Sequence, residues 1–451
     1  MNRPVYSDFP SRSLNRVLLL QGPVGPFFAR LQGCLEAAGV ACRRVCFNAG
    51  DRHFATRRGR IDFSGSLAEW RDWLRACLED GGFDAVVGFG CLRPQHVVAR
   101  RLAEEAGLAF LSLEEGYLRS GFITAEFGGN NACSPLAGRL PPPGFVPASA
   151  TSLAPPEQAF RSFSAMCRQG AVYYTLRSLL SRPCEKALFH RRVSLLREPL
   201  SWTRNALRYS QGRARDFRVI EQLLEHHDGR YFLVPLQVAV DSQMGEPALG
   251  WTADRLIKDV LNAFARQAPG RSRLAFKIHP LERGHTNARR TVMETATQLG
   301  IAQRVDVLET GSLGLLIRHA AGVITINSTA GLSAIFHGTP LLVVGKAVYS
   351  HPALATCAQG EPRFDGFWNR GPAADAQLRQ RYLAWIRQEA LVPGDFYAED
   401  GIPLACAGVM ARLRAMPFRG AQPICADHGQ NMLHPLHGRL QTARIIDRFA
   451  S

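Results

Sequence analysis

Lysine is nearly absent from this chain of 451 residues: four of its 54 basic residues are lysine, and the rest are arginine. Long apolar runs are also absent, because no segment approaches the roughly 18 residues that a membrane-spanning helix needs. Only residues 17–20 form an apolar run before Gln21, which is too short for the apolar region of a secretory signal. We therefore expect a cytoplasmic protein.

Common catalytic and metal-binding patterns are missing as well. There is no D-x-D, H-E-x-x-H or G-x-S-x-G, so a metal-chelating sugar-nucleotide site, a zinc hydrolase and a serine hydrolase have no motif behind them. The eleven cysteines are scattered, with Cys42 and Cys46 the closest pair and no C-x-x-C. Such a set indicates reduced core thiols rather than disulfides. We expect no metal and no cofactor.

The remaining composition is that of a folded protein with two domains. Hydrophobic residues make up 46% and charged residues 20%, and the length suits two domains of about 200 residues each. The net charge of +16 favours anionic partners such as a nucleotide, a nucleic acid or an acidic membrane surface. A GC-rich genome also produces a uniform arginine bias, so the charge does not select among these partners.

Two regions alternate strand-like and helix-like segments, a pattern typical of parallel βαβ units. The first predicts a Rossmann-like domain over residues 1–135, with strands at 16–21, 43–51, 83–90 and 109–116. The second predicts another such domain over residues 219–420, with strands at 231–238, 273–280, 304–309, 322–328 and 340–345. The fold class is therefore α/β, with two Rossmann-like domains and a cleft between them.

The region between these domains is different in character. Residues 136–218 contain a Pro/Gly-rich loop followed by helical, basic sequence, with eleven Arg or Lys against three Asp or Glu in 176–218. We expect this region to pack on the N-terminal half. Residues 421–451 are expected to form a C-terminal tail.

Ligands of such sheets bind outside the carboxyl ends of the strands. Polar residues gather at the predicted strand ends: Gln21 with Gly22 and Gly25, Asn48, Asp51, Glu114, Glu115, Asp241, Gln243, His279 and Asn327–Thr329. This concentration is the clearest functional signal in the sequence.

His279 stands at one of these strand ends and precedes Pro280. Proline disfavours helical backbone in the residue before it, so His279 is held extended at the end of its strand. Its imidazole can donate a hydrogen bond to a phosphate oxygen or protonate a leaving group. A loop histidine satisfied by its neighbours would look the same, so both interpretations stay open.

Asn327, Ser328 and Thr329 lead from a strand end into a helix. Hydroxyl groups and free N–H groups at a helix N-terminus bind anions, helped by the helix dipole. A simple N-cap is the alternative, because Ser or Thr supplies one anyway.

Glu114 and Glu115 close another strand before Gly116, and Arg119 follows. Alternation points adjacent side chains to opposite faces, but a strand that bends into a Gly turn brings both carboxylates to the cleft. Paired carboxylates suit acid–base or nucleophilic catalysis. The alternative is a solvated acidic turn in which Arg119 is the partner.

The turn containing Gln21, Gly22 and Gly25 is rich in glycine but matches neither G-x-G-x-x-G nor the P-loop. It gives no support for a dinucleotide or ATP site. It would allow a ligand to approach the backbone closely.

Together these blocks resemble the capsule polysaccharide biosynthesis family (KpsS/LipB type). The resemblance covers most of the chain and rests on VLLLQGPVGPFFARL with FNAGD, EEGYLRSGF, PLQVAVDSQ, KIHPLERG and INSTAGLSAIFHGTPLLVVGKAVY, in that order. It implies a GT-B fold, in which two Rossmann-like domains face a central cleft. It also implies transfer of Kdo from CMP-Kdo to a phosphatidylglycerol-type lipid, giving the β-linked Kdo linker of a capsular polysaccharide.

The resemblance also implies roles for individual residues. The CMP-sugar would lie on the C-terminal domain, at His279, Pro280, Lys277, Asn327, Ser328, Thr329, Gln243 and Asp241. The acceptor would lie on the N-terminal domain, where Gln21, Gly22, Gly25, Asn48, Asp51 and Arg119 would line the cleft. Donor and product are both β, so the reaction retains configuration, with Glu115 as nucleophile, Glu114 as acid or base and His279 stabilising the leaving group. Related transferases often carry Glu-Asp-Gly where this chain has Glu-Glu-Gly.

Partners follow from the same resemblance: an anionic phospholipid, the inner-membrane surface and other capsule assembly proteins, but no nucleic acid. The basic stretch 176–218 would meet the membrane, with Phe189, Trp202 and Tyr209 at the interface. Three alternatives stay open: another CMP- or UDP-sugar transferase, a non-catalytic export or assembly scaffold, and a nucleic-acid binder. No RNA-binding or helix-turn-helix signature supports the last.

Overall fold

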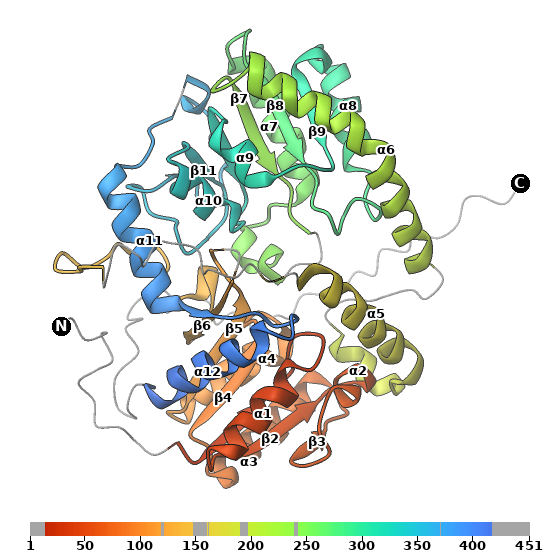
Figure 1. Cartoon of the computed structure of the whole chain (residues 1–451), viewed down its shortest axis with the longest axis vertical. Coiled ribbons are helices and arrows are strands. Elements are labelled where there is room, and N and C mark those ends of the chain that lie inside the picture. The colour runs from red at the N-terminus through yellow and green to blue at the C-terminus, as the bar shows by residue number, and fades with distance from the viewer. Residues whose placement is uncertain are drawn as a thin grey trace, which may run out of the picture. The chain divides into compact units, whose positions relative to one another are not determined.

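The structure, a computed structural model, describes residues 14–118, 121–147, 160, 162–189, 197–238, 242–369 and 371–416 (Figure 1). Within these ranges the strands form two sheets, and helices cover the faces of both. Short 3-10 helices interrupt the loops at η1 (Asn131–Cys133), η3 (Pro183–Leu188), η4 (Ser242–Met244), η5 (Glu246–Ala248), η6 (Ala302–Arg304) and η7 (Phe367–Asn369).

The first sheet has seven strands in the order β13-β6-β5-β4-β1-β2-β3. Five are parallel: β1 (Arg16–Leu19), β2 (Ala41–Cys46), β3 (Arg60–Asp62), β4 (Ala85–Phe89) and β5 (Ala109–Glu115). At one edge β6 (Phe122–Phe127) pairs antiparallel with β5, and β13 (Leu391–Pro393) pairs antiparallel with β6. The helices of this half are α1 (Phe27–Ala37), α2 (Ala49–His53), α3 (Leu67–Gly81), α4 (Pro94–Glu105) and α12 (Gly401–Arg414).

The second sheet has six strands, all parallel, in the order β12-β11-β10-β7-β8-β9. They are β7 (Tyr231–Pro235), β8 (Arg273–Lys277), β9 (Val305–Leu308), β10 (Gly322–Thr325), β11 (Leu341–Val343) and β12 (Thr356–Cys357). The helices of this half are α7 (Ala253–Gln267), α8 (Ala288–Gln298), α9 (Leu313–Arg318), α10 (Ala330–His337) and α11 (Ala376–Ala390). The strand order reverses at β7, which pairs with β8 on one side and β10 on the other. Ligands of doubly wound sheets bind at such a reversal.

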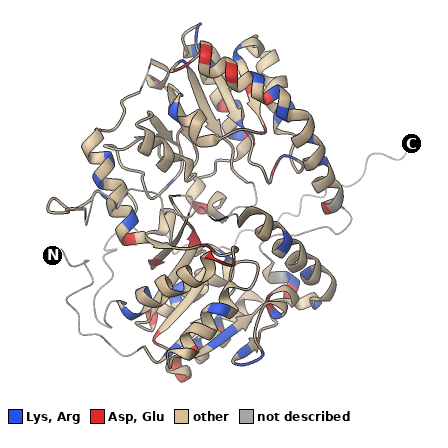
Figure 2. Cartoon of the chain, in the orientation of Figure 1, with Lys and Arg blue, Asp and Glu red and all other residues tan. Residues whose placement is uncertain are grey.

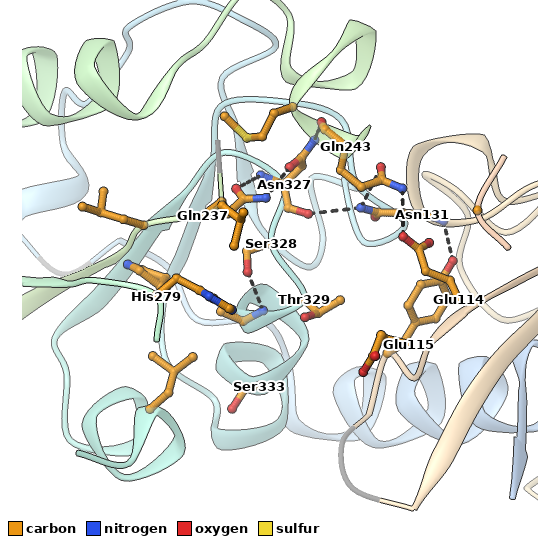
Figure 3. Close-up of a pocket in the computed structure, with 18 of the residues that line it drawn as sticks. Glu114, Glu115, Asn131, Gln237, Gln243, His279, Asn327, Ser328, Thr329 and Ser333 are labelled. Carbon is orange, nitrogen blue, oxygen red and sulfur yellow. Dashed lines mark hydrogen bonds between the residues drawn. The ribbon is translucent and has the colours of Figure 1, made fainter. Parts of the chain in front are cut away.

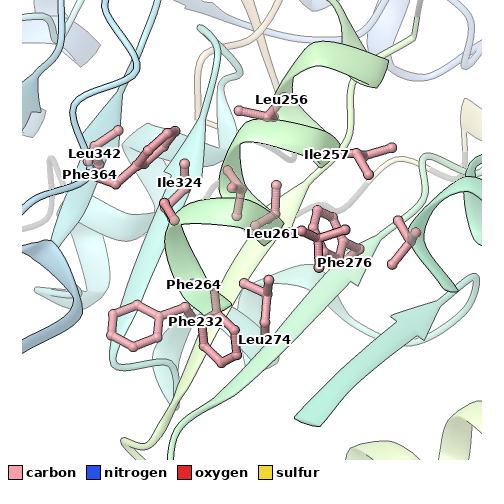
Figure 4. Packing of buried hydrophobic residues seen from close by; sticks show 14 of the residues in the cluster. Phe232, Leu256, Ile257, Leu261, Phe264, Leu274, Phe276, Ile324, Leu342 and Phe364 are labelled. Carbon is pink, nitrogen blue, oxygen red and sulfur yellow. The ribbon is translucent and has the colours of Figure 1, made fainter. Parts of the chain in front are cut away.

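The core of the second half forms between this sheet and α7 (Figure 4). Thr252 caps α7 by accepting a hydrogen bond from the N–H of Arg255 at 3.1 Å. Full burial of each large apolar side chain contributes about 2 kcal/mol, and this packing holds the ends of β7, β8 and β10 in place. The packed side chains include Phe232, Leu256, Ile257, Leu261, Phe264, Leu274, Phe276 and Ile324.

The chain returns to the first sheet near its end. α11 leads into β13, which pairs with β6, and α12 then packs against α1. This corrects the predicted boundary of the C-terminal domain at 219–420, because residues 391–416 belong to the first half. Their apolar side chains, such as Val392 and Ile402, complete the core around β1. The predicted tail 421–451 lies outside the described residues.

The region between the halves is helical, as predicted, but it divides between them. α5 (Ser162–Leu180) packs against α2 of the first half, whereas α6 (Arg197–His226) runs along β9 of the second half (Figure 1). Buried Asp216 fixes α6 by accepting from the N–H groups of Glu309 and Thr310 at 2.7 and 2.8 Å. The expectation that the whole region packs on the N-terminal half is therefore wrong for α6.

Two Rossmann-like sheets, joined by this helical region and by the return of β13, give the α/β fold of GT-B type that the sequence predicts. Figure 2 shows Lys and Arg on α6, on α11 and on the helices around the first sheet. The positive charge is therefore not confined to the 176–218 stretch.

Candidate active site

A cavity of about 1310 Å³ lies at the carboxyl ends of the strands, with lining residues from both halves. The first sheet contributes Glu114 and Glu115 from the end of β5. The second contributes the segments that follow β7, β8 and β10, including Gln237, His279 and Asn327 (Figure 3). Because β7 and β10 flank the reversal of strand order, the cavity lies where this fold binds ligands.

His279 lies at the tip of β8, half-buried, with Pro280 exposed after it. The N–H of Leu281 donates to its Nδ1 at 3.2 Å. The neutral ring therefore carries its proton on Nε2, which makes Nε2 the donor toward a ligand. Figure 3 shows the ring facing the turn of Ser328 and Thr329.

That turn begins α10 at the tip of β10. The N–H of Ala330 donates to Ser328 Oγ at 3.2 Å, and Thr329, at the N-cap, makes no side-chain cap bond. Ser333, one turn further along, also lines the cavity. Tyr349 donates its hydroxyl to the carbonyl of Ser328 at 2.5 Å and packs where a side chain at Gly331 would stand. The turn is thus held rigidly. The first N–H groups of α10 are bonded to Ser328 and Thr329, so this end of the helix attracts an anion through its dipole and through the hydroxyl groups of those two residues.

Asn327 lines the cavity at the end of β10, and its side chain is engaged with neighbouring residues. Its side chain exchanges hydrogen bonds with neighbours rather than pointing only at the cavity: Gln237 Nε2 donates to its Oδ1 at 2.8 Å, and its Nδ2 donates to the carbonyl of Gln243 at 2.8 Å. The Asn327 side chain is buried. It therefore positions the two loops that form the cavity wall.

A chain of amide groups continues from Asn327 to the other half. Asn131, which follows β6, donates from Nδ2 to the carbonyl of Asn327 at 3.2 Å and to Oε1 of Gln243 at 3.3 Å. Its Oδ1 accepts from the N–H of Val348 at 2.9 Å. Gln243 in turn donates to Oε1 of Glu114 at 3.4 Å. Glu114 is thereby tied to the second half through the predicted ligand residue Gln243.

Glu115 lies beside Tyr397 rather than in this amide chain. Burial, followed by the charge and the hydrogen bond of Glu115, raises the pKa of Tyr397 well above its usual value. Both Glu115 and Tyr397 line the cavity. The expectation that both adjacent carboxylates reach the cleft is met, and in Figure 3 Glu115 faces the cavity across from His279.

Lys277 is a buried cation at the end of β8. Burial, with a smaller effect of Arg283, lowers its pKa to about 8, although Asp216 and Glu309 oppose the shift. Near neutral pH it still carries its charge most of the time. It lines the cavity next to His279 and so adds to the positive potential there.

Five predicted cleft residues lie elsewhere. Gln21, Asn48 and Asp51 are buried, and the hydroxyl of Tyr173 from α5 donates to Asp51 Oδ1 at 2.9 Å. Gln21 and Asn48 donate to Asp51 as well, at 3.1 and 2.8 Å. Gly22 packs against Phe28, and Gly25 packs against Gln169 of α5 with φ at +103°. This corrects their assignment to the cleft. α5 covers the carboxyl ends of β1 and β2, and these five residues are buried there instead of lining the cavity.

Two predicted residues, Arg119 and Asp241, lie outside the described residues. Several lining residues were not predicted: Arg93, Asn131, Gln237, Ser333, Arg387 and Tyr397. The sequence holds a signal for Gln237 and Ser333, because each lies within six residues of a predicted strand end. Asn131 and Tyr397 follow loops with no periodic signal.

Phe189, predicted at a membrane interface, lines the cavity instead, with Arg177 stacked over its ring at 4.3 Å.

The described part of the chain holds no group of three His, Cys, Asp or Glu side chains placed to bind a metal ion. Among the described helices, none has the length and apolarity required to cross a membrane.

The family described as "Capsule polysaccharide biosynthesis protein" matches residues 84–397. The chain belongs to this family. It is 33% identical over 384 residues to the capsule polysaccharide export protein KpsS of Escherichia coli, covering 85% of this chain and 97% of that protein. It is 30% identical over 396 residues to the capsule polysaccharide modification protein LipB of Neisseria meningitidis, covering 87% and 94%.

Among solved structures, the chain is similar to a β-Kdo 2,7-transferase, KpsC, of Thermosulfurimonas dismutans, with 14% identity and a TM-score of 0.40. That similarity covers 88% of this chain and 99% of the other. A UDP-GlcNAc 2-epimerase of Neisseria meningitidis has 12% identity and a TM-score of 0.30, covering 88% of this chain and 99% of the other.

Proposed function

We propose that this protein is a metal-independent glycosyltransferase that moves Kdo from CMP-Kdo to a phosphatidylglycerol-type lipid with retention of configuration. One observation carries the proposal: a single cavity has an anion-binding side and a carboxylate side. His279 and the N-terminus of α10 form the first, and Glu114 and Glu115 form the second. Membership of a capsule biosynthesis family supports the choice of sugar and acceptor.

The phosphate of the donor binds between Nε2 of His279 and the start of α10, where the hydroxyl groups of Ser328 and Thr329 can donate and the helix dipole is positive. These donors are fixed before the reaction, so they stabilise the negative charge that develops as CMP leaves. Lys277 lines the same cavity and adds a positive charge. The same groups serve the role that a divalent cation serves in other sugar-nucleotide sites.

In the first step a carboxylate oxygen of Glu115 attacks the anomeric carbon of Kdo, and the bond from that carbon to the phosphate oxygen breaks. CMP leaves with the electron pair, and Kdo is esterified to Glu115. In the second step the acceptor hydroxyl attacks the same carbon and releases Glu115, while Glu114 takes the hydroxyl proton. Two inversions give overall retention.

We also propose that the protein works at the inner-membrane surface. α6 exposes Trp202 and Tyr209, which is typical of residues at a membrane interface. Some of the arginines of α6 are engaged in contacts within the protein. Arg204 donates to Oδ1 of Asn287 at 2.7 Å, and Arg208 donates to the carbonyl of Thr286 at 2.9 Å.

The test is incubation of the purified protein with CMP-Kdo and phosphatidylglycerol, followed by mass spectrometry of the lipid and measurement of free CMP. Kdo-modified lipid that depends on Glu115 supports the proposal. Release of a nucleotide from another CMP- or UDP-sugar, but none from CMP-Kdo, would indicate a different transferase. No nucleotide release with any donor would favour a non-catalytic role in capsule export or assembly.

A further inference from the structure

A second cavity, of about 660 Å³, runs along α6. Trp202, Tyr209 and Phe217 of α6 line it, together with Phe163 of α5 and the aliphatic side chain of Ile220. We call it the α6 groove. Its volume falls within the range of about 300–1,000 Å³ that is usual for ligand pockets.

The large apolar side chains of the α6 groove are exposed to an unusual extent. Phe217 is 66% exposed, Phe163 57%, Tyr209 47% and Trp202 41%. Isolated exposed apolar residues are common, but a contiguous set around a groove marks a binding site. The helix cannot rotate to bury them, because Asp216 of α6 is buried and accepts from the N–H groups of Glu309 and Thr310, which also line the groove.

The spacing along α6 explains why these side chains share one groove. Positions 202, 209, 213, 217 and 220 are separated by seven, four, four and three residues, which places them on one helical face. Arg213 is the one charged residue in that series. The groove is therefore an apolar surface with a cation along its edge.

The α6 groove adjoins the active-site cavity. Lys277, Pro280 and Gly311 line both cavities, and His279 stands between two of them in sequence. A flexible molecule can therefore extend from one cavity to the other past the His-Pro turn.

The inner part of the groove is cationic. Arg283 is buried there and stacks on Tyr209 at 5.0 Å, and its guanidinium donates to the carbonyl of Glu309 at 2.7 Å and to Oδ1 of Asn205 at 3.1 Å. With Lys277 and Arg213 it gives the groove lining three cationic residues against one carboxylate residue, Glu309. The ligand that fits has an apolar tail and an anionic group near its polar end.

We propose that the α6 groove binds one acyl chain of the anionic lipid acceptor, and that the polar headgroup enters the active site past Lys277. The proposal rests on the proposed function in that it takes the acceptor to be a lipid. It adds where the lipid chain lies and which residues set the preference for chain length.

Trp202 provides a direct test that needs no turnover. It is the most exposed of the six tryptophans, since Trp70, Trp251, Trp368 and Trp385 are buried and Trp73 is half-buried. Lysophosphatidylglycerol with a brominated acyl chain, used below its micelle concentration, should quench tryptophan fluorescence with saturation. The quenching should disappear in Trp202→Phe, while lipid binding measured by equilibrium dialysis should remain.

Phe217→Ser tests the groove by weakening apolar contact, and Leu404→Ser on α12 is the matched control, because Leu404 is also exposed but lies on the other half. Phe217→Ser should raise the Kd for the brominated lipid about tenfold, as loss of one aromatic contact does. It should raise the KM for a long-chain acceptor by a similar factor and leave the KM for a short-chain acceptor unchanged. Leu404→Ser should change none of these.

Three results would overturn the assignment. One is no saturable quenching in the wild-type protein. Another is equal quenching by a brominated uncharged detergent, which would indicate adventitious apolar binding. The third is unchanged lipid binding in Phe217→Ser with reduced binding to phosphatidylglycerol vesicles, which would mean that the groove residues face the membrane itself. Saturable quenching without Kdo transfer would instead contradict the proposed function and leave the lipid site in place.

Discussion

The side-chain amide of Asn131 donates to the backbone carbonyl of Asn327 at 3.2 Å, which joins the loop after β6 to the tip of β10. Asn131 adopts φ of +51°, a left-handed conformation that asparagine tolerates better than most residues. Its backbone N–H also donates to the hydroxyl of Tyr117. One residue thus fixes the carboxylate side of the cavity against the anion-binding side.

Asn131→Asp should impair transfer while keeping the fold. Aspartate tolerates the same backbone conformation and can still accept from Val348, but it cannot donate to Asn327 and Gln243, and its charge faces their oxygens. We expect kcat/KM to fall by at least about tenfold and the free energy of unfolding to fall by about 1–3 kcal/mol. Steady-state kinetics and urea denaturation measure the two effects. Wild-type kinetics would show that the amide chain does not position the site.

Glu126 gives a prediction for the pH dependence of stability. Burial raises its pKa from 4.5 to about 7, although Tyr117 and Ser134 donate to its carboxylate, both at 2.5 Å. Because the folded pKa lies above the unfolded one, the folded state binds more protons between about pH 4.5 and 7. The contribution of protonated Glu126 to the free energy of unfolding is thus complete below pH 4.5. It is lost as the pH rises to 7, by about 3 kcal/mol in total.

Glu126→Gln removes this titration, so its free energy of unfolding should fall less than that of the wild type between pH 5 and 7. Chemical denaturation at several pH values measures the slope. Glu69→Gln, at an exposed helix N-terminus, is the control and should keep the wild-type slope in this range. Equal slopes in Glu126→Gln and the wild type would contradict the raised pKa.

The strand ends were predictable because their signal is local. Buried runs such as Val17–Leu20 and Leu274–Ile278 stop at polar residues, and parallel strands bring those residues to one edge. Glu114, Glu115, His279, Ser328 and Thr329 were found in this way. What the prediction could not supply was which strand ends stay open to a ligand.

Long-range packing decided that question. Tyr173 lies 122 residues from Asp51, yet its hydroxyl closes the tips of β1 and β2. Similarly, β13 is a three-residue strand whose partner, β6, precedes it by more than 260 residues. Neither pairing leaves a periodic pattern in the sequence. Asn131 was not predicted for a related reason: its contacts are with three loops that are distant from it in the sequence.

His279→Ala should lower kcat about 100-fold, the scale of a lost acid or charge-stabilising group. His279→Gln should recover part of the rate, since its amide can donate where Nε2 does. The affinity for CMP, measured by calorimetry, should fall in both variants, and the melting temperature should stay near that of the wild type because the ring is half-buried. Wild-type turnover in His279→Ala would remove His279 from the reaction.

Glu115 is the residue on which the two-step mechanism depends. It ends β5, precedes Gly116 and lines the cavity across from His279. If it is the nucleophile, CMP-Kdo without acceptor should leave Kdo esterified to Glu115. Peptide mass spectrometry after rapid acid quenching should then find the added Kdo mass on the peptide that contains Glu115.

Two variants separate nucleophile from acid or base. Glu115→Gln should abolish transfer and the adduct but still bind CMP, because the anion-binding groups lie on the other half. Glu114→Gln should slow the second step more than the first, because Glu114 is the proposed proton acceptor for the acceptor hydroxyl. The adduct should therefore accumulate in Glu114→Gln even when lipid is present. An adduct on another residue, or full transfer by Glu115→Gln, would show that the carboxylate pair does not provide the nucleophile.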